Sequence, residues 1–564
     1  MVKKKIFERF SFSVPMILLV AAGLRLWGIG FGLPDLFHAD EPIVVNHALQ
    51  FGSGDFNPHF FNIPPLASYL LFGIYGVLYL IGKIFGFWEN TIQFAEHFFR
   101  DPTIFYLLGR VTLGVIPAVA SVYLLMAWMR KFFSSEKWVY LAGSLFAVCF
   151  VHVSDAHYIY ADMSLILVCL IFFYLLHSLD IKKEGSHLKL GLLIGLAMAF
   201  KYNGVFLVAP YLWMHGRLSK TLIHFLMSSL IAALGTLLAF SVLNPFAILD
   251  PAFFLNELRE QSAANQGVPF WHHLTYSLAE GMSWPLVILG VLGGVRTFFS
   301  RDVRREIVSV FCLIYYFVLW KKGQPYGRYI LPLVPFLIIL AIEAALAMSK
   351  KNIILRMTAF SLLIYAVGWN IAKDIRFNWI MAQPDVRAEA SQWIEENIPS
   401  GSKIALDGTS FTPQLSFSCE QLQGKLNGNQ NQDSTQFKRI QARLRVCNER
   451  PSFNLFFLTD RLGSNPFLFT SPEILFNSEK LIKKQIRYVV LVAESQSSAS
   501  KRGLLGNSAK LIKIWEPRPP QSSDLVVFDA QVITGGPFTW KDLWSRTANG
   551  YRIELYDLDA VAVR

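Results

Sequence analysis

The chain has 564 residues, of which 53% are hydrophobic, 15% aromatic and only 16% charged. This composition excludes a large water-soluble enzyme and indicates a polytopic membrane protein. A net charge of +12 would suggest a nucleic-acid partner in a soluble protein, but here the basic residues fall in short clusters between apolar segments. We interpret these clusters as topology signals and expect a lipid bilayer, with no nucleic acid, as the partner.

The first apolar segment, about Phe12 to Leu33, is long enough to cross a bilayer. It holds Arg25 and has no clear small-residue cleavage site, so we predict a membrane helix rather than a signal peptide. The basic residues before it favour a cytoplasmic N-terminus; they are Lys3, Lys4, Lys5 and Arg9. The adjacent carboxylates of Asp40 and Glu41 then emerge on the opposite face, either as solvated loop charges or as part of a site.

Two apolar segments precede the next basic cluster, Arg130 to Lys137; they are about Ile63 to Phe87 and about Thr103 to Trp128. If both crossed the membrane, this basic cluster would lie outside, against the positive-inside tendency. The first of them opens with Pro64-Pro65 and is interrupted by glycines. We therefore predict that it does not cross and that the 34-102 outer loop contains juxtamembrane helices.

The remaining apolar segments alternate with basic loops, and we count eleven crossings over residues 1-371. The stretch from Leu190 to His215 joins two basic loops, so it must cross an even number of times. This predicts a hairpin of two short helices with Lys201 near its tip. The cluster from Lys321 to Tyr329 is the basic stretch that this count places outside. Further spans are predicted at about Trp138 to Val153, Ser164 to Leu179 and Leu222 to Leu243. Another span returns from the outer loop, Asn244 to Ser283, to the basic residues Arg301 to Arg305. The last three are predicted at about Ile307 to Trp320, then up to Met348 and up to Ile371.

Residues 372-564 have the composition of a soluble domain, which this topology places on the extracytoplasmic face. The apolar spacing from Pro384 to Ile398 predicts an amphipathic helix. Strands are predicted at Lys403 to Leu406, Arg487 to Val492 and Leu511 to Trp515, so we expect a small α/β domain. Cys419 and Cys447 lie in this domain, where an oxidising compartment makes a disulfide a testable option.

The predicted outer face collects a chemically useful set of side chains. Carboxylates can orient and deprotonate a hydroxyl, and cations at helix breaks can hold a phosphate leaving group. A lysine in an apolar hairpin also costs about 3 kcal/mol at membrane depth, which favours a functional role for Lys201. The central candidates are Asp40, Glu41, Asp162, Lys201 and Arg328. The supporting candidates are His38, His59, Asp155, His157, Tyr202, Lys321 and Lys322.

Metal binding is the other interpretation of these groups. His152, Asp155 and His157 lie close in sequence, but no zinc-like spacing completes a site. For Arg328, an interfacial anchor beside Tyr326 and Tyr329 is an alternative to phosphate binding. We expect no metal and no other cofactor.

Several short motifs resemble those of family 39 membrane glycosyltransferases, the group of protein O-mannosyltransferases and lipid A aminoarabinose transferases with the GT-C fold. They are Arg25-Leu26-Trp27, His38-Ala39-Asp40-Glu41-Pro42, Asn57-Pro58-His59-Phe60-Phe61, Lys201-Tyr202-Asn203-Gly204 and Gly327-Arg328-Tyr329-Ile330-Leu331-Pro332. The resemblance covers the membrane part to about Ile371. Many bacterial members have proline where this chain has Ala39.

The resemblance implies inverting transfer of a sugar from a polyprenyl-phosphate carrier to an acceptor hydroxyl, on the extracytoplasmic face of the cytoplasmic membrane. On this analogy Asp40 is the base, Glu41 its neighbour and Asp162 the second carboxylate of the site. Lys201 and Arg328 bind the phosphate of the donor lipid. The carrier keeps its phosphate throughout, so no nucleotide-binding loop is needed, and the sequence contains none.

A flippase or transporter for lipid-linked sugars is the main competing hypothesis. It predicts ionisable residues at the membrane midplane and repeat symmetry, whereas the candidates here collect on one face and the sequence shows no repeat. A non-catalytic assembly protein built around the outer domain is a third possibility, and it would tolerate the loss of Asp40.

Overall fold

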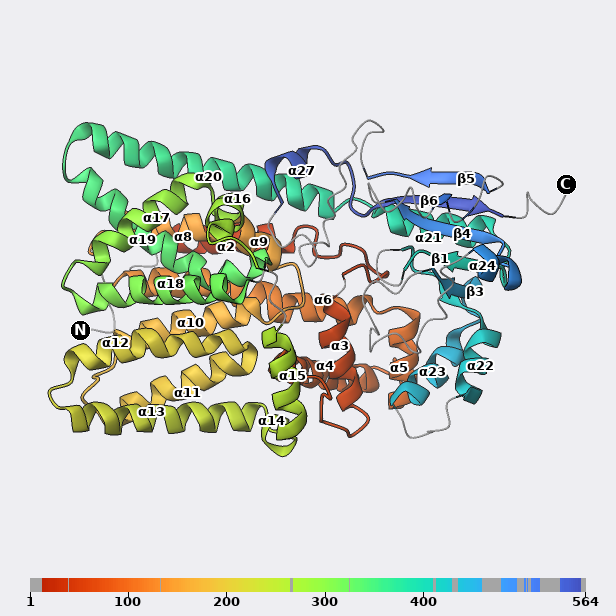
Figure 1. Ribbon diagram of the computed structural model, residues 1–564, viewed down its shortest axis with the longest axis horizontal. Coiled ribbons are helices and arrows are strands. Elements are labelled where there is room, and N and C mark those ends of the chain that lie inside the picture. Colours follow the sequence, from red (N-terminus) through yellow and green to blue (C-terminus); the bar gives the residue numbers. More distant parts are fainter. Residues whose placement is uncertain are drawn as a thin grey trace.

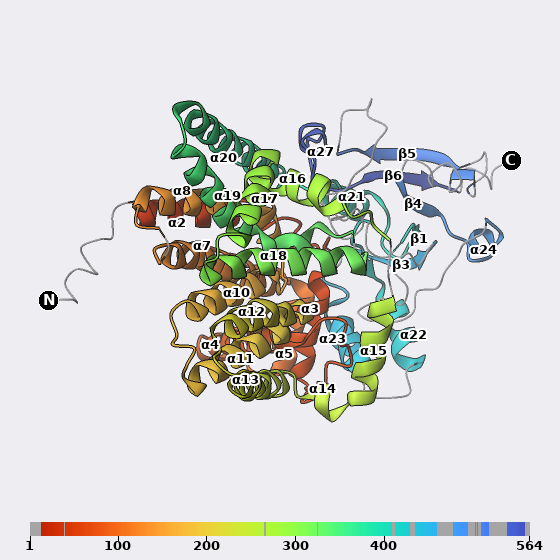
Figure 2. The ribbon, with the colours of Figure 1, turned by 60° about the vertical axis from the view of Figure 1, so that its left-hand side comes forward.

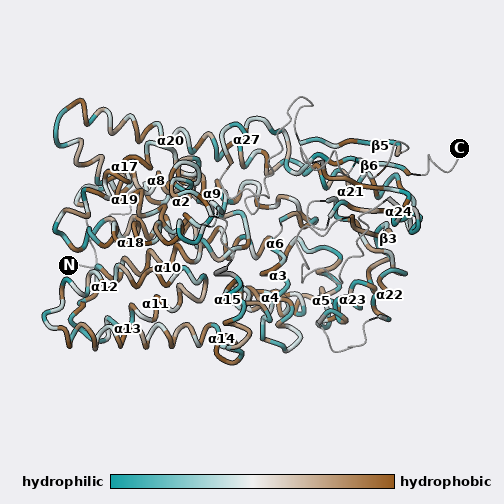
Figure 3. Tube along the Cα trace, in the orientation of Figure 1, coloured by the Kyte–Doolittle hydropathy of each residue, from teal (hydrophilic) through white to brown (hydrophobic). Residues whose placement is uncertain are grey.

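The computed structural model describes residues 13–38, 40–131, 133–263, 267–323, 325–408, 412–428, 435–458, 478–493, 502–503, 505, 509–517 and 538–558. The basic residues before the first apolar segment, and Ala39, lie outside the described residues. The apolar helices gather at one end of the molecule and the strands at the other (Figures 1 and 2). Hydrophobic residues dominate the helical end, and polar ones are more frequent around the strands (Figure 3).

The first two thirds of the chain are helical. The helices are α2 (Ser13–Leu26), α3 (Glu41–Phe51), α4 (Leu66–Ile84), α5 (Thr91–Arg100), α6 (Thr103–Gly109), η1 (Arg110–Val115), α7 (Ile116–Met129), α8 (Glu136–Ala147), α9 (Phe150–Asp155), α10 (Asp162–Leu176), α11 (Glu184–Phe200), η2 (Tyr202–Leu207), α12 (Val208–Leu218), α13 (Leu222–Leu243), α14 (Phe246–Leu249), α15 (Pro251–Ala263), η3 (His273–Leu278), α16 (Ala279–Met282), α17 (Trp284–Phe298), α18 (Val303–Lys322), η4 (Gly327–Leu333), α19 (Val334–Ser349) and α20 (Ile353–Met381).

This part has the apolar helices of a polytopic membrane protein. Among the described residues, 5 helices are long and apolar enough to cross a membrane, or up to 6 if the pair His273–Met282 and Trp284–Phe298, bent by 117°, is one span. α2 and α10 are shorter apolar helices. The multi-pass helical architecture is confirmed, and the number of eleven crossings stays a prediction.

The segment Leu66–Ile84 passes the length and composition test for a span, although the sequence predicts that it does not cross. Its two flanks, however, contact the same C-terminal domain. Before α4, the backbone carbonyl of Asn46 accepts a hydrogen bond of 2.8 Å from Arg439. After α4, Arg100 pairs with Glu449. Both flanks therefore lie at the end of the molecule that carries the strands, which supports a juxtamembrane position for α4.

Three predicted spans differ from the observed helices. The first, predicted to reach about Leu33, ends as a helix at Leu26, because turns with positive φ at Gly28 and Gly32 follow it. The helix predicted to end at about Ile371 continues to Met381, because its polar residues after Ala372 are buried against neighbouring segments rather than solvated. Lys373 donates to the carbonyls of Glu280 and Phe538, at 2.8 and 2.6 Å. The segment predicted as one span from Trp138 to Val153 is broken after Ala147 into α8 and α9.

The C-terminal domain is an α/β domain, as expected. Its elements are α21 (Val386–Asn397), β1 (Lys403–Leu406), β2 (Ser416–Phe417), α22 (Cys419–Gly428), α23 (Thr435–Val446), β3 (Ser452–Phe457), α24 (Ser478–Lys483), β4 (Tyr488–Ala493), β5 (Lys510–Trp515), α27 (Trp540–Trp544) and β6 (Arg552–Asp557). They form a six-stranded sheet of order β2-β3-β1-β4-β6-β5. The first four strands are parallel, and β6 pairs antiparallel with β4 and β5. The disulfide between Cys419 and Cys447 is formed.

Candidate active site

Asp40 lies where the chain turns into α3. It is the N-cap residue of that helix, but its side chain makes no capping hydrogen bond. Pro42 at the start of the helix favours helix initiation directly after Asp40. The carboxylate is thus available for contacts outside its own helix.

The carboxylate of Asp40 is held by two distant groups. Arg328 Nη1 lies 2.9 Å from its Oδ2, and the Tyr160 hydroxyl donates to the same oxygen at 2.9 Å. Burial acts to raise the pKa of Asp40, but the charge of Arg328 and the hydrogen bonds from Arg328 and Tyr160 outweigh it and keep the pKa below the ordinary value. Asp40 is therefore ionised near neutral pH.

His38 supports Asp40 from behind. The backbone N–H groups of Asp40 and Glu41 point at His38 Nδ1, at 3.2 and 3.4 Å. Since Nδ1 accepts these bonds, the neutral ring carries its proton on Nε2 and donates it to the Tyr160 hydroxyl, 3.2 Å away. His38 and Tyr160 form a chain of hydrogen bonds that orients the Asp40 carboxylate.

Arg328 lies in η4 among aromatic rings. Its guanidinium carbon is 4.6 Å from the centroid of Tyr160, 5.7 Å from that of Tyr326 and 5.8 Å from that of Tyr329. Arginine stacks favourably on aromatic faces, so these rings hold the cation where it meets Asp40. The contact with Asp40 makes Arg328 more than an interfacial anchor.

Lys201 interrupts the helical hairpin, as predicted. It adopts extended φ and ψ angles of −158° and 132° between α11 and η2. Its ammonium lies 2.5 Å from Asp162 Oδ1, at the first residue of α10. It also lies 4.6 Å from the Tyr329 ring centroid, so Lys201 and Arg328 both contact this ring. The two ion pairs therefore belong to one site.

Glu41 belongs to a separate ion pair and not to Asp40–Arg328 or Asp162–Lys201. Arg110 donates two hydrogen bonds of 2.8 and 2.7 Å to the Glu41 carboxylate, and both side chains are 2% exposed. Arg110 also donates to the carbonyls of Ile29 and Phe31, and the backbone N–H of Ile159 donates to Glu41. The contacts of Glu41 are those of an anchor for the start of α3.

The other supporting candidates lie elsewhere or act indirectly. His157 is buried, with its ring nitrogens near the carbonyls of Val153 and Trp27. His59 is exposed and pairs with Asp55 at 3.0 Å. The Tyr202 hydroxyl donates to the Phe61 carbonyl and so ties the Lys201 turn to the loop before α4. Lys321 and Lys322 are exposed at the end of α18, with Lys321 over the Trp320 ring.

Asp155 ends α9, close enough to Asp162, Arg328 and Lys201 for their charges to affect it. Its carboxylate oxygens have no hydrogen-bond partner among the described residues. Burial and the charge of Asp162 raise the pKa of Asp155 above its ordinary value, and the charges of Arg328 and Lys201 oppose the rise. Within the described part of the chain, no three His, Cys, Asp or Glu side chains gather as metal ligands.

Sequence reasoning missed Arg110, Tyr160 and the role of Tyr329. Arg110 is a lone cation in the apolar run from Thr103 to Trp128, and averaging hydropathy over that run hides it. An arginine at such a position must be paired, which is the signal that could have found it. Tyr160 and Tyr329 each flank a predicted site residue but have no charge to mark them.

Comparisons with solved structures identify the fold. ArnT from Cupriavidus metallidurans in the apo state is 13% identical over 89% of this chain and 96% of that chain, with a TM-score of 0.51. ArnT bound to undecaprenyl phosphate is 12% identical over 98% of both chains, also with a TM-score of 0.51. The apo oligosaccharyltransferase from Archaeoglobus fulgidus is 13% identical over 90% of this chain and 73% of that chain, with a TM-score of 0.49.

No protein-family profile matches the chain, and no curated protein matches its sequence. The likeness to ArnT is thus a likeness of fold at low identity. The protein has a GT-C-like membrane fold with a C-terminal α/β domain. Membership of family 39 in particular stays an expectation from the sequence motifs.

Proposed function

We propose that the protein is an inverting glycosyltransferase that moves a sugar from a polyprenyl-phosphate carrier to an acceptor hydroxyl. The observation that carries this proposal is the convergence of two ion pairs, Asp40 with Arg328 and Asp162 with Lys201, around Tyr329. A carboxylate base and two cations within one site match the needs of attack by a hydroxyl and departure of a phosphate.

Asp40 is the general base in this mechanism. Its depressed pKa keeps it ionised, and it takes the proton of the acceptor hydroxyl as that oxygen attacks the anomeric carbon. The leaving phosphate departs from the opposite face of the sugar, so the configuration inverts. His38 and Tyr160 orient the base, and Glu41 fixes the helix that carries it.

Lys201 and Arg328 receive the phosphate of the carrier. In the free protein each cation already has a carboxylate partner. A bound phosphate therefore shares these cations with their carboxylates or replaces the carboxylates. Asp40 is then free to accept the proton of the acceptor hydroxyl when the donor is present. Binding of undecaprenyl phosphate by the fold relative ArnT supports a lipid phosphate as the donor group.

The proposed reaction site faces the extracytoplasmic side of the cytoplasmic membrane, on the same side as the C-terminal domain. This sidedness rests on the positive-inside count and on the contacts that join the C-terminal domain to the segment after α2. The proposal needs no metal, because the two cations can meet the charge of the phosphate.

The test is transfer by the purified full-length protein. Radiolabelled polyprenyl-phosphate sugars are incubated with the protein and total envelope lipid, and label in a new product is measured. Asp40→Asn should lower turnover by about 10² to 10⁴ with donor affinity nearly unchanged, since the amide keeps the shape but cannot act as the base. Asp55→Asn, an exposed carboxylate outside the site, is the matched control.

Full transfer by a folded Asp40→Asn variant would refute the assignment of the base. A flippase gives a different pattern: labelled lipid changes leaflet in reconstituted vesicles, and no sugar is transferred by either protein. If Asp40 had only a structural role, Asp40→Asn would lower thermal stability together with activity.

A further inference from the structure

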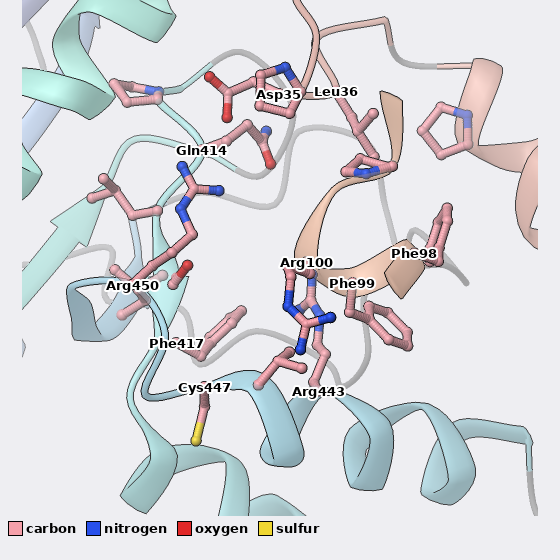
Figure 4. A pocket seen from close by; sticks show the side chains of 18 of the residues that line it. Asp35, Leu36, Phe98, Phe99, Arg100, Gln414, Phe417, Arg443, Cys447 and Arg450 are labelled. Atoms are coloured by element: carbon pink, nitrogen blue, oxygen red, sulfur yellow. The ribbon is translucent and has the colours of Figure 1, made fainter. Parts of the chain in front are cut away.

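A cavity of about 270 Å³ lies between the membrane part and the C-terminal domain. One wall is the segment from Pro34 to Asn46, together with the end of α5. The opposite wall comes from the loop before β2, the end of α23 and the residues that follow it (Figure 4). The volume is small for a ligand pocket, which suits one sugar ring with its substituent better than a lipid chain.

Three arginines from both walls converge on this cavity: Arg100, Arg443 and Arg450. Figure 4 shows the guanidinium groups of Arg100 and Arg443 side by side, with Arg450 reaching in from the C-terminal domain. The acidic lining residues are Asp35 and Glu449, and Glu449 is engaged by Arg100 through bonds of 2.5 and 2.6 Å. Arg450 also pairs with Glu395, which lies outside the lining, at 3.7 Å. Among the described residues that line the cavity, three arginines thus face two carboxylates.

The positive charge is also partly desolvated. Arg443 and Arg439 lie one turn apart on α23, and Arg439 donates to the Asn46 carbonyl. Burial, with the charge of Arg439, lowers the pKa of Arg443 to about 10. Like charges at this helical spacing repel each other, so a bound anion would relieve the repulsion.

The uncharged lining fits a sugar. Phe99 and Phe417 present aromatic rings, and Gln414 and Ser416 present groups that can donate and accept hydrogen bonds. His38 is part of the wall, and its ring nitrogens contact the backbone N–H of Asp40 and the hydroxyl of Tyr160. The cavity therefore borders the segment that carries the proposed base.

We propose that this cavity is an anchoring subsite for the acceptor, and that it binds a sugar unit bearing a phosphate or a carboxylate. The subsite holds a part of the acceptor other than the reacting hydroxyl, which must reach Asp40. This inference rests on the proposed transferase function. In this proposal the C-terminal domain forms one half of the acceptor site. The acceptor belongs to the class of anionic glycans.

Direct binding tests the subsite without any donor. Glucose 6-phosphate, glucuronate and glucose are titrated into the full-length protein, and affinity is measured by calorimetry or saturation-transfer NMR. We expect both charged sugars to bind at least tenfold more tightly than glucose, and their ratio tells phosphate from carboxylate. Equal binding of the three sugars, or tighter binding of an acidic peptide, would overturn the proposal.

Two variants and one matched control locate the binding. Arg450→Gln removes a cation from the cavity and should weaken binding of the charged sugars about tenfold. Gln414→Trp fills the cavity and should weaken all binding there, and it serves as the second variant if the first is unstable. Arg445→Gln is the control, because Arg445 lies on α23 close to Arg450 in sequence but pairs with Glu96 at 3.2 Å, outside the lining. Equal effects of Arg450→Gln and Arg445→Gln would also overturn the subsite.

The subsite and the transferase function can fail separately. Asp40→Asn should leave the binding of charged sugars unchanged. If no acceptor is ever labelled but the binding pattern holds, the transferase proposal fails and the anion site stands. If transfer is found and the KM for the acceptor is unchanged in Arg450→Gln and in Gln414→Trp, the subsite fails and the transferase function stands.

Discussion

Four charged residues define the proposed reaction site, and their pairing carries most of the chemistry. Asp40 and Arg328 are 288 positions apart in the chain, and Asp162 and Lys201 are 39 apart. The sequence could predict that these four residues share a face, since each follows or interrupts an apolar segment. It could not predict which carboxylate pairs with which cation, because the pairing depends on how the helices pack.

Lys201 gives the sharpest test at the residue scale. Charge-assisted contacts to phosphate are worth about 1.5 to 3 kcal/mol, so Lys201→Ala should weaken polyprenyl-phosphate binding by one to two orders of magnitude. Asp162→Asn removes the carboxylate that holds Lys201 at 2.5 Å, so donor affinity should be kept or increased. Lys322→Ala, at an exposed position, is the control.

Direct binding of the labelled carrier phosphate measures all three variants. If Lys201→Ala and Asp162→Asn lose affinity equally, the pair is structural and Lys201 is not a phosphate ligand.

The burial of Asp35 should make the free energy of unfolding depend on pH. Burial raises the pKa of Asp35 to about 6, with Glu395 and Asp385 adding to the rise and Arg450 and Arg387 opposing it. Because the folded pKa exceeds the ordinary value of 3.8, ionisation costs folding free energy. Stability is lost as pH rises from about 4 to about 6, by at most about 3 kcal/mol for a shift of two units.

Asp35→Asn removes that cost. Its melting temperature should exceed that of the unmodified protein at pH 8 and match it at pH 4, where Asp35 is already neutral. A constant difference between the two proteins across this range would show that Asp35 ionises without penalty.

At the scale of elements, helix α3 is held by one buried ion pair. Glu41 and Arg110 join the start of α3 to η1 and to the backbone after α2. Breaking a buried pair by removing one partner typically costs about 3 to 5 kcal/mol, since the other charge stays buried. Glu41→Gln should therefore lower stability much more than Asp40→Asn does.

Thermal unfolding of the two variants in the same detergent measures this difference. Glu41→Gln should lose turnover in proportion to its folded fraction, and the double variant Glu41→Gln/Arg110→Met should recover part of the stability. A Glu41→Gln protein with normal stability and no turnover would instead make Glu41 part of the chemistry.

Element boundaries were predictable where local chemistry sets them. Strand β1 runs over Lys403–Leu406, as its β-branched and apolar pattern predicts, and the helical hairpin breaks at Lys201. The end of α20 was missed by ten residues, because Lys373 and Asp374 look solvated in sequence but are buried by distant segments. Tertiary contacts overrode the composition signal there.

At the scale of the whole molecule, α4 decides the topology. If α4 does not cross, Ser134 is cytoplasmic and Ser400 is extracytoplasmic; if it crosses, the two positions exchange sides. Both residues are exposed. The free cysteines Cys149, Cys169 and Cys312 are buried, so single cysteines can be introduced without removing the disulfide.

We expect an impermeant thiol reagent to label Ser400→Cys in intact cells and to label Ser134→Cys only after permeabilisation. The reverse pattern would place α4 across the membrane and the C-terminal domain in the cytoplasm. Labelling of both positions in intact cells would contradict either topology.

Helix α20 determines where the molecule can be cut. Its 29 residues make a rod of about 43 Å, longer than the roughly 30 Å hydrocarbon core of a bilayer. The last turns lie between the two parts of the molecule, since Arg376 donates to the carbonyls of Leu543 and Arg546 and Asn378 donates to that of Leu24 in α2. A fragment starting at residue 372 would begin inside α20. The apolar side chains of its last turns would lose the membrane helices that cover them, so the fragment should aggregate. A fragment starting after Met381 leaves the rod with the membrane part, and it is the one suited to expression on its own.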